Sequence, residues 1–243
     1  MDKIVINNSS SNNITIDRDS YILIDGNMDN STIQLNVQNC KATIVDIASG
    51  NQKRCLNIIN DNSNIEYNII DLLDSDVNYY IDEKIINVNS NTDINIASVC
   101  YKNKNKNYVI NTSNLDRNST NSINCFGIVK DESKLNYDIT SFIKNGATKS
   151  VVKQNSSILL FDESSVGKSN PILVIEENDV KANHGSSIGK IDDETMFYLC
   201  SRGLSKIEAT NLICLGKIQH LIDKIEDVNT KEALINEFKE RMV

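Results

Sequence analysis

The residues best suited to redox or metal chemistry are six cysteines and two histidines, spread widely along the chain. The cysteines are Cys40, Cys55, Cys100, Cys125, Cys200 and Cys214. A zinc knuckle or a local redox pair needs cysteines only a few residues apart, and no two here lie closer than fourteen. We therefore expect reduced thiols of a cytoplasmic protein. Cys40, Cys55, Cys100 and Cys125 remain candidate ligands, although a buried thiol more often acts as a small hydrophobe.

Hydrolytic chemistry finds little support in the sequence. Residues 165–169 (Ser-Val-Gly-Lys-Ser) end like a phosphate-binding loop, but Asp162 stands where the first glycine belongs. Residues 185–190 also fall short of such a loop. No Gly-x-Ser-x-Gly elbow accompanies either histidine. Carboxylates are plentiful without a spacing that singles out a pair, so a β-helical polysaccharide lyase or hydrolase stays open as an alternative.

His184 is the more informative of the two histidines. Alternation along residues 180–184 (Val-Lys-Ala-Asn-His) places it on the same side of a strand as Ala182. The plainer interpretation is a structural histidine at the end of a core strand, with its hydrogen-bonding groups satisfied there. A ligand or proton-handling role is the other, because neutral imidazole binds transition metals and titrates near neutral pH.

The composition limits which folds could position these residues. The chain has 243 residues, a formal charge of −8 and a pI of about 4.9, which argues against a generic nucleic-acid binder. Neither a membrane-spanning apolar run nor a signal-type N-terminus is present. The 36 Asn and 35 Ile fit either an AT-rich coding bias or a stacked β architecture, with isoleucine inside and asparagine in turns.

Short segments with a period of two fill the first 190 residues. The predicted strands cover residues 14–16, 21–24, 31–37, 42–47, 85–88, 94–99, 108–110, 157–161 and 171–175, with turn-rich connectors at 25–30, 111–114 and 116–121. Periodicity alone leaves a sandwich, a stack or a solenoid open, and no strict repeat is visible. Only Asp25-Gly26 and Asn145-Gly146 are hairpin-type dipeptides, so we favour the wide turns of a parallel β-helix.

The period becomes helical after residue 190. Acidic residues 192–194 favour the first turn of a helix, where they stabilise its free N–H groups. Gly203 suits the C′ position just after the end of that helix. Residues 205–208 match a capping box that opens an amphipathic helix of about twenty residues. Gly216 inside it suggests close packing at that point, and His220 is expected on the surface. A last helix is predicted from about residue 230. The domains are therefore 1–190, a β core, and 191–243, a helical domain that docks onto the end of the β domain or onto another protein.

Residues 171–209 carry a more specific signal. They contain a Pro-x-Leu strand, an Asp-Val-Lys strand leading into His-Gly, and then Asp-Glu-x-x-Phe-Tyr-Leu-x-Ser-Arg-Gly-Leu before an amphipathic helix. This pattern closely resembles the C-terminal segment of the SufB/SufD family of iron–sulfur cluster assembly proteins. The resemblance spans about residues 156–213, and the preceding part agrees in style only.

The resemblance implies a mainly β fold, a right-handed parallel β-helix ending in a small α-helical domain. It implies a non-enzymatic scaffold that pairs with SufB or with itself and binds SufC, an ABC-type ATPase, through the helical domain. ATP would then be consumed in the partner, and no cofactor would be tightly bound, although a transient iron–sulfur cluster could form at the dimer interface. The residues implied to contact the ATPase are Asp193, Glu194, Phe197, Tyr198, Ser201, Arg202 and Gly203.

Matched residue by residue, His184 falls on the SufD histidine implicated at that interface and becomes the metal or cluster candidate. Ala182 replaces the usual SufD cysteine, and Ser156 replaces the SufB cluster-site cysteine. Asn183 and Gly185 stand where acidic residues flank the SufB histidine. Thiolates are the preferred ligands of iron–sulfur clusters, so these positions cannot form that site alone. The chain resembles SufD or a degenerate member, and a structural β-solenoid without a cluster role is the remaining alternative.

Overall fold

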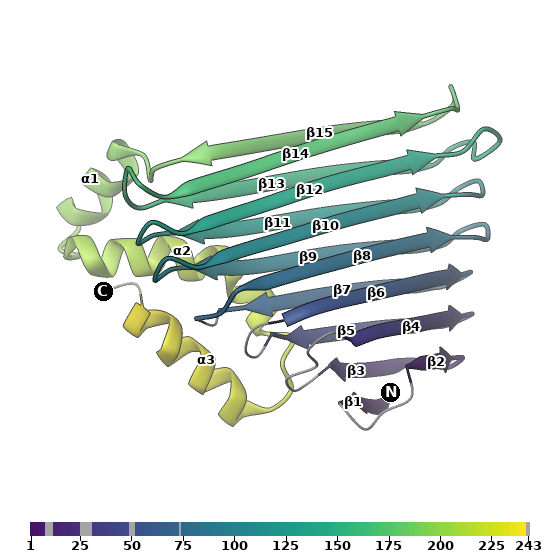
Figure 1. Ribbon diagram of the computed structural model, residues 1–243, viewed down its shortest axis with the longest axis horizontal. Helices are drawn as coiled ribbons and strands as arrows, with labels where there is room; N and C mark the ends of the chain where they lie inside the picture. The colour runs from purple at the N-terminus through teal and green to yellow at the C-terminus, as the bar shows by residue number, and fades with distance from the viewer. Residues whose placement is uncertain (8–11, 25–30, 49–51, 73, 242–243) are drawn as a thin grey trace.

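The computed structural model describes residues 1–7, 12–24, 31–48, 52–72 and 74–241. These residues form a mainly β, parallel β-solenoid followed by three helices, which confirms the expected fold class (Figure 1). Successive strands alternate between two sheets, and every strand pairs in parallel with the strand two positions along the chain. The stack rises from β1 to β15, and the helices gather on one side of it (Figure 1).

Odd-numbered strands form one sheet and even-numbered strands form the other. The odd sheet consists of β1 (Asp2–Ile6), β3 (Ser20–Ile24), β5 (Lys41–Ile47), β7 (Asn64–Asp71), β9 (Asn91–Cys100), β11 (Thr120–Val129), β13 (Val151–Leu160) and β15 (Lys181–Gly189). The even sheet consists of β2 (Asn13–Ile16), β4 (Ser31–Gln38), β6 (Gln52–Asp61), β8 (Val77–Ile85), β10 (Asn105–Asn114), β12 (Lys134–Ile143) and β14 (Val166–Ile175). The helices are α1 (Asp193–Ser201), α2 (Lys206–Ile222) and α3 (Val228–Arg241).

The core lies between the two sheets and consists of ladders of like residues. Leu56, Ile81, Ile110 and Ile139 occupy matching positions in four consecutive even strands, and all four are buried. Branched side chains suit this pleated interior, which explains the isoleucine content. The predicted strands at 31–37, 42–47 and 94–99 are confirmed within a residue or a few. The strand at 85–88 is wrong because β8 ends at Ile85, and the connector at 111–114 is wrong because those residues complete β10.

Asparagine residues form many of the turns between strands. Asn39, Asn62, Asn89 and Asn118 adopt left-handed backbone, with φ between 51° and 58°. Asparagine tolerates this conformation because its short side chain bonds to nearby peptides. Gly146, in one of the two hairpin-type dipeptides, also has a positive φ, of 91°. The connector at 25–30, with the other dipeptide, lies outside the described residues.

Aromatic and charged groups are stacked inside the solenoid as well. Tyr79, Tyr108 and Tyr137 form a ladder with ring centroids 5.6 and 5.4 Å apart. Gly127 makes room for it, since a Cβ there would clash with Leu135 and lie 3.1 Å from the Tyr137 hydroxyl. Buried ion pairs accompany the ladder, because Tyr79 donates to Asp46, the partner of Arg54, and Tyr108 donates to Asp71, the partner of Lys106. These four buried charges are thus paired, as burial requires.

Helix α2 covers part of the outer face of the odd sheet. Its buried residues Cys214, Ile218 and Leu221 join one apolar cluster with Ile70 and Val99 of the sheet. The helix therefore packs on a face of the β-solenoid. One of the two expectations from the sequence was docking at the end of the β domain instead. Ser205 and Glu208 form the predicted capping box. The close packing expected at Gly216 is wrong, because a Cβ there would meet nothing within 4 Å.

Helix α3 crosses the same side of the stack. Leu234 and Phe238 are buried in the cluster that α2 shares with the sheet. Near the end of the helix, Lys130 Nζ of the turn after β11 donates to the Arg241 carbonyl over 2.8 Å. These contacts join the last two helices to the β-solenoid. The strands end at Gly189 and the first helix begins at Asp193, so the helices follow the strands in the chain but pack against them in space.

Candidate functional site

Helix α1 collects the residues predicted to bind an ATPase, and it contributes little to the core. It has no buried residue, and its two aromatic side chains, Phe197 and Tyr198, are 76% and 56% exposed. Asp193 and Glu194 are exposed in its first turn. An exposed apolar group rimmed by charge is typical of a surface that binds another protein. The structure thus gathers these predicted residues on one exposed helix.

Local capping explains why this helix forms despite its exposure. Asp192 accepts a hydrogen bond from the Thr195 amide over 2.7 Å. Hydrogen bonds from the side chain and from the amide of Thr195 lower the pKa of the Asp192 carboxyl. At the other end Ser201 donates to the Tyr198 carbonyl over 2.7 Å. Gly203 follows with a φ of 97°, the left-handed conformation expected after a helix. Caps of this kind satisfy the free backbone groups at helix ends.

The guanidinium of Arg202 lies 5.2 Å from the centre of the Tyr198 ring. A cation over an aromatic face is attracted by the ring quadrupole. This contact holds the ring beside the exposed end of α1 and places a positive charge next to an apolar surface. Aromatic and arginine side chains are the types most enriched where protein interfaces are strongest.

His184 lies on β15, the last strand of the odd sheet. It pairs in register with Gln154 of β13 and shares its side of the strand with Ala182, as the alternation predicts. No described strand continues the odd sheet beyond β15, so the imidazole is exposed. It is therefore not the satisfied core histidine of the plainer interpretation. A cluster or metal role for His184 stays a prediction.

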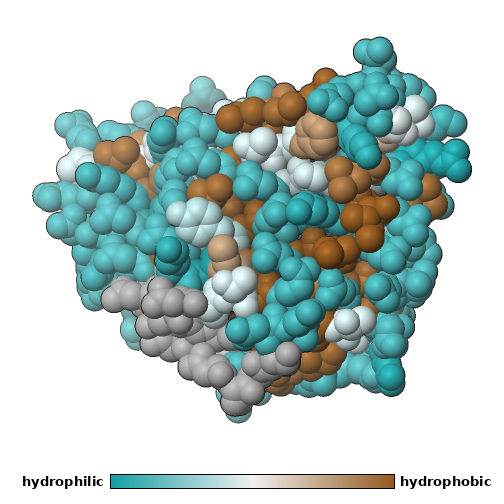
Figure 2. Space-filling view, turned by 45° about the vertical axis from the view of Figure 1, so that its right-hand side comes forward, coloured by the Kyte–Doolittle hydropathy of each residue, from teal (hydrophilic) through white to brown (hydrophobic). Residues whose placement is uncertain are grey.

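The open end of the β-solenoid also exposes apolar side chains that sequence reasoning did not single out. They belong to β14 and β15 and comprise Val166, Ile172, Val174, Ile175 and Ile188, each between 43% and 50% exposed. In Figure 2 apolar surface appears along the upper rim of the molecule, where β14 and β15 lie in Figure 1. The signal was present as a hydrophobic strand at 171–175. Its exposure becomes visible only when the position of the strand in the stack is known.

Ser156, where the resemblance places a cluster-site cysteine, points into the last turns of the solenoid. Its hydroxyl lies 2.7 Å from that of Ser169 in β14. In register beside it are Cys125 of β11 and Ser186 of β15. The nearest thiol is therefore one strand further inside, where Cys125 is 4% exposed. Burial raises the pKa of that thiol far above its usual range.

The other buried cysteines are likewise poor ligand candidates as they stand. Cys40, Cys100 and Cys214 are buried, Cys55 is half-buried and Cys200 is exposed. Burial raises the pKa of Cys100 to about 11 and that of Cys214 to about 12. A thiolate is the metal-binding form, so these shifts oppose ligation. Among residues 1–7, 12–24, 31–48, 52–72 and 74–241, no group of three His, Cys, Asp or Glu side chains could hold a metal ion.

The segment that resembles a phosphate-binding loop has another structure. Gly167, Lys168 and Ser169 lie within β14, where extended backbone cannot cradle a phosphate. Asp162 accepts hydrogen bonds from the amides and hydroxyls of Ser164 and Ser165, which lower the pKa of its carboxyl to about 2. The residue that replaces the missing glycine thus organises a turn.

Comparison with known proteins places this geometry in context. The sequence profile described as "SUF system FeS cluster assembly, SufBD core domain" matches residues 26–217. The iron–sulfur cluster assembly protein SufD of Bacillus subtilis is 34% identical over 110 residues, which cover 45% of this chain and 25% of the relative. SufD of Escherichia coli is 28% identical over 115 residues, covering 47% and 27%. SufB of Bacillus subtilis is 34% identical over 61 residues, covering 25% and 13%.

The aligned segment therefore spans about a quarter of each SufD relative. Across the part of the chain that the structure describes, no helix is both long and apolar enough to cross a membrane.

Proposed function

Since the chain belongs to the SufBD core family of the iron–sulfur cluster assembly system, we propose that it is a non-enzymatic scaffold subunit of a Suf-type assembly complex. The observation that carries the proposal is the exposed helix α1. Two aromatic side chains of this helix are exposed to solvent, although the chain has only 13 Phe and Tyr residues in all. An ordered, capped helix with this surface fits a protein partner.

The partner of α1 in this proposal is a SufC-type ABC ATPase. The contact surface consists of Asp193, Glu194, Phe197, Tyr198, Ser201, Arg202 and Gly203. Phe197 and Tyr198 supply the apolar centre, and Asp193, Glu194 and Arg202 supply a charged rim. Movements of the bound ATPase would reach the β-solenoid through α2, because α1 packs on α2 and α2 packs on the odd sheet.

The second partner is a SufB-like subunit or another copy of this chain, which would cover the open end at β14 and β15. Exposed Ile172, Val174 and Ile188 favour such a contact, and the unpaired edges of both strands can accept a further strand. His184 would then lie at the interface as a neutral nitrogen ligand for a transient cluster. The thiolates would come from the other subunit, because Ser156 and Ala182 supply none.

The ATPase contact can be tested by co-purification. A SufC-type ATPase should be retained by the full chain and lost, or weakened at least tenfold, with the double variant F197A/Y198A. Val228→Ala is the matched control, because Val228 is 63% exposed on α3 and lies outside the proposed surface. Retention of the ATPase by F197A/Y198A at the wild-type level contradicts the proposal.

The role of His184 needs a separate experiment. Cluster reconstitution with a SufB-like partner, followed by visible absorbance, should give less cluster with His184→Ala than with the wild-type chain. Asn183→Ala, which changes the neighbouring residue on the opposite side of β15, is the control. Equal absorbance for His184→Ala and the wild type removes His184 from the cluster site.

A further inference from the structure

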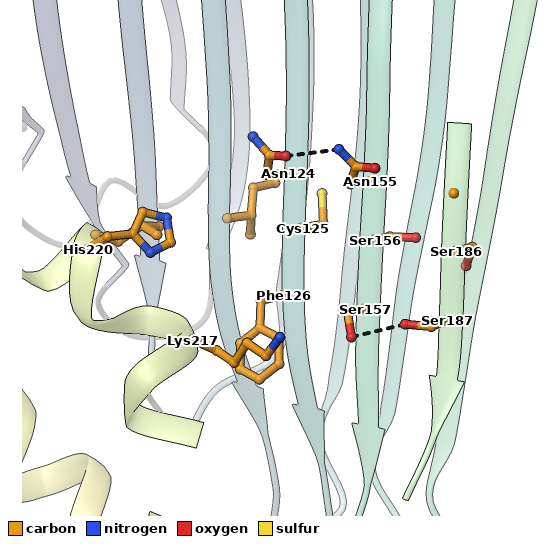
Figure 3. Close-up of a pocket in the computed structure, with 13 residues that line it drawn as sticks. Asn124, Cys125, Phe126, Asn155, Ser156, Ser157, Ser186, Ser187, Lys217 and His220 are labelled. Carbon is orange, nitrogen blue, oxygen red and sulfur yellow. Dashed lines mark hydrogen bonds between the residues drawn. The ribbon is translucent and has the colours of Figure 1, made fainter. Parts of the chain in front are cut away.

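A groove of about 610 Å³ runs between helix α2 and the outer face of the odd sheet. Its floor comprises β11, β13 and β15, and one wall is α2 (Figure 3). The volume falls within the range of small-molecule sites. The groove lies on the outer face of the sheet, whereas His184 faces the opposite side of β15. It also shares no residue with α1. The proposed scaffold function therefore leaves it unused.

Hydrogen-bonded side chains hold the floor of this groove. Asn155 donates to Asn124, Asn124 donates to Asn95 and Asn95 donates to Asn68, over 3.0 to 3.3 Å. The next row carries hydroxyls, where Ser187 of β15 donates to Ser157 of β13 over 3.1 Å (Figure 3). Side chains fixed in this way present their remaining polar atoms in a set geometry, so a ligand need not order them.

Two positively charged or chargeable side chains reach over this floor from α2. Lys217 and His220 lie one helical turn apart and project toward the strands (Figure 3). Neither forms an ion pair or a hydrogen bond with any residue in the described ranges, whereas the nearby Lys224 pairs with Glu66 over 2.8 Å. None of the 13 residues that line the groove is acidic, although the chain has 33 Asp and Glu residues. The groove is therefore a positively polarised site on an acidic protein.

Apolar surface completes the groove. Phe126 of β11 and Leu221 of α2 both line it. Both belong to the cluster that holds α2 against the sheet, so their positions are fixed by the fold. The groove thus combines cationic donors, hydroxyls and a small apolar wall, which suits a ligand with an anionic head and an apolar body.

We propose that this groove binds a small organic anion, whose carboxylate or phosphate head is held by Lys217 and the Ser157–Ser187 hydroxyls, with His220 lining the other end of the groove. Its apolar body lies against Phe126 and Leu221. The charge-assisted hydrogen bond from the lysine supplies most of the selectivity for an anion. This site is independent of the ATPase surface and of the open end of the solenoid.

Titration calorimetry of the full chain with phenyl phosphate and with benzoate, at low ionic strength, tests the site. We expect saturable binding at one site per chain, and the probe that binds more tightly identifies the head group. The double variant K217Q/H220Q should weaken binding about tenfold or more. The matched double variant H184Q/K239Q removes the same two residue types outside the groove and should leave the affinity unchanged.

Circular dichroism spectra that match the wild type establish that both double variants fold. The proposal is overturned if the wild-type chain shows no saturable binding of either probe. It is also overturned if H184Q/K239Q weakens binding as much as K217Q/H220Q does, because general electrostatic attraction would then explain the binding. Neither result bears on the ATPase contact, which is measured without these probes.

Discussion

Helices α1 and α2 are neighbours in the chain, yet they use their apolar residues in opposite ways. Six residues of α2 are buried, among them Ile218 and Leu221 against the odd sheet, whereas α1 buries none and exposes Phe197 and Tyr198. Both helices are properly capped, so the difference does not come from poor helix formation. It indicates that α2 serves the chain's own stability, and it fits the proposed role of α1 in an external contact.

The largest effect should come from emptying the core position of α2. Ile218→Ala leaves a cavity in the cluster between α2 and the sheet, and we expect it to lower the free energy of unfolding by about 2–5 kcal/mol. Phe197→Ala on α1 truncates a larger side chain, but one that is exposed to solvent. It should therefore change the free energy of unfolding by less than about 0.5 kcal/mol. Urea unfolding followed by circular dichroism measures both. Equal losses would erase the distinction between the helices.

A cap substitution should show a smaller version of the same contrast. Ser205→Ala breaks the capping box of α2 and should lower the free energy of unfolding by about 1 kcal/mol. Ser201→Ala, at the end of α1, removes a hydroxyl that bonds only within that helix and should lower it by less than about 0.5 kcal/mol. Thermal and urea unfolding of both variants provide the measurement. A larger loss for Ser201→Ala would show that α1 is part of the cooperative core.

The smallest effect is a response to acidic pH, and it should be confined to helix α1. The folded-state pKa of Asp192 is lowered by its hydrogen bond from Thr195. The cap therefore stabilises α1 above the ordinary pKa of an aspartate and is lost as the pH falls through the lowered value. We expect α1 to fray over that window in the wild type, and already at neutral pH in Asp192→Ala. Carbon chemical shifts of residues 193–201 report this, and a pH response identical in both proteins would contradict it.

Alternation is clearest in a strand that keeps one face partly in solvent. Residues 31–37 alternate cleanly because the outer face of β4 is only partly covered, and that strand is predicted almost to the residue. The alternation disappears in the second half of β11, which is buried on both faces and was not predicted. Residues 94–99 of β9 are also buried on both faces and were predicted, so burial alone does not decide the outcome. Caps are local, so the ends of α1 and the start of α2 could be predicted from a few residues.

The candidate sites were predictable to a different extent. The surface of α1 follows from contiguous residues and needs only a helix to gather Phe197 with Tyr198. His220 is on the surface as expected, but the groove could not be foreseen, because the positions of Lys217 and His220 over the odd sheet depend on how α2 docks. The register that sets Cys125 beside Ser156 is likewise a long-range property, because these two residues lie 31 positions apart in the sequence.

Amide hydrogen exchange of the full chain, with and without a SufC-type ATPase, tests the central claim most directly. The account predicts that binding slows exchange in residues 193–203 and leaves the buried face of α2 unchanged, because that face is already packed against the sheet. Unchanged exchange across residues 193–203 in a complex that is demonstrably formed would contradict it and would show that the ATPase binds elsewhere.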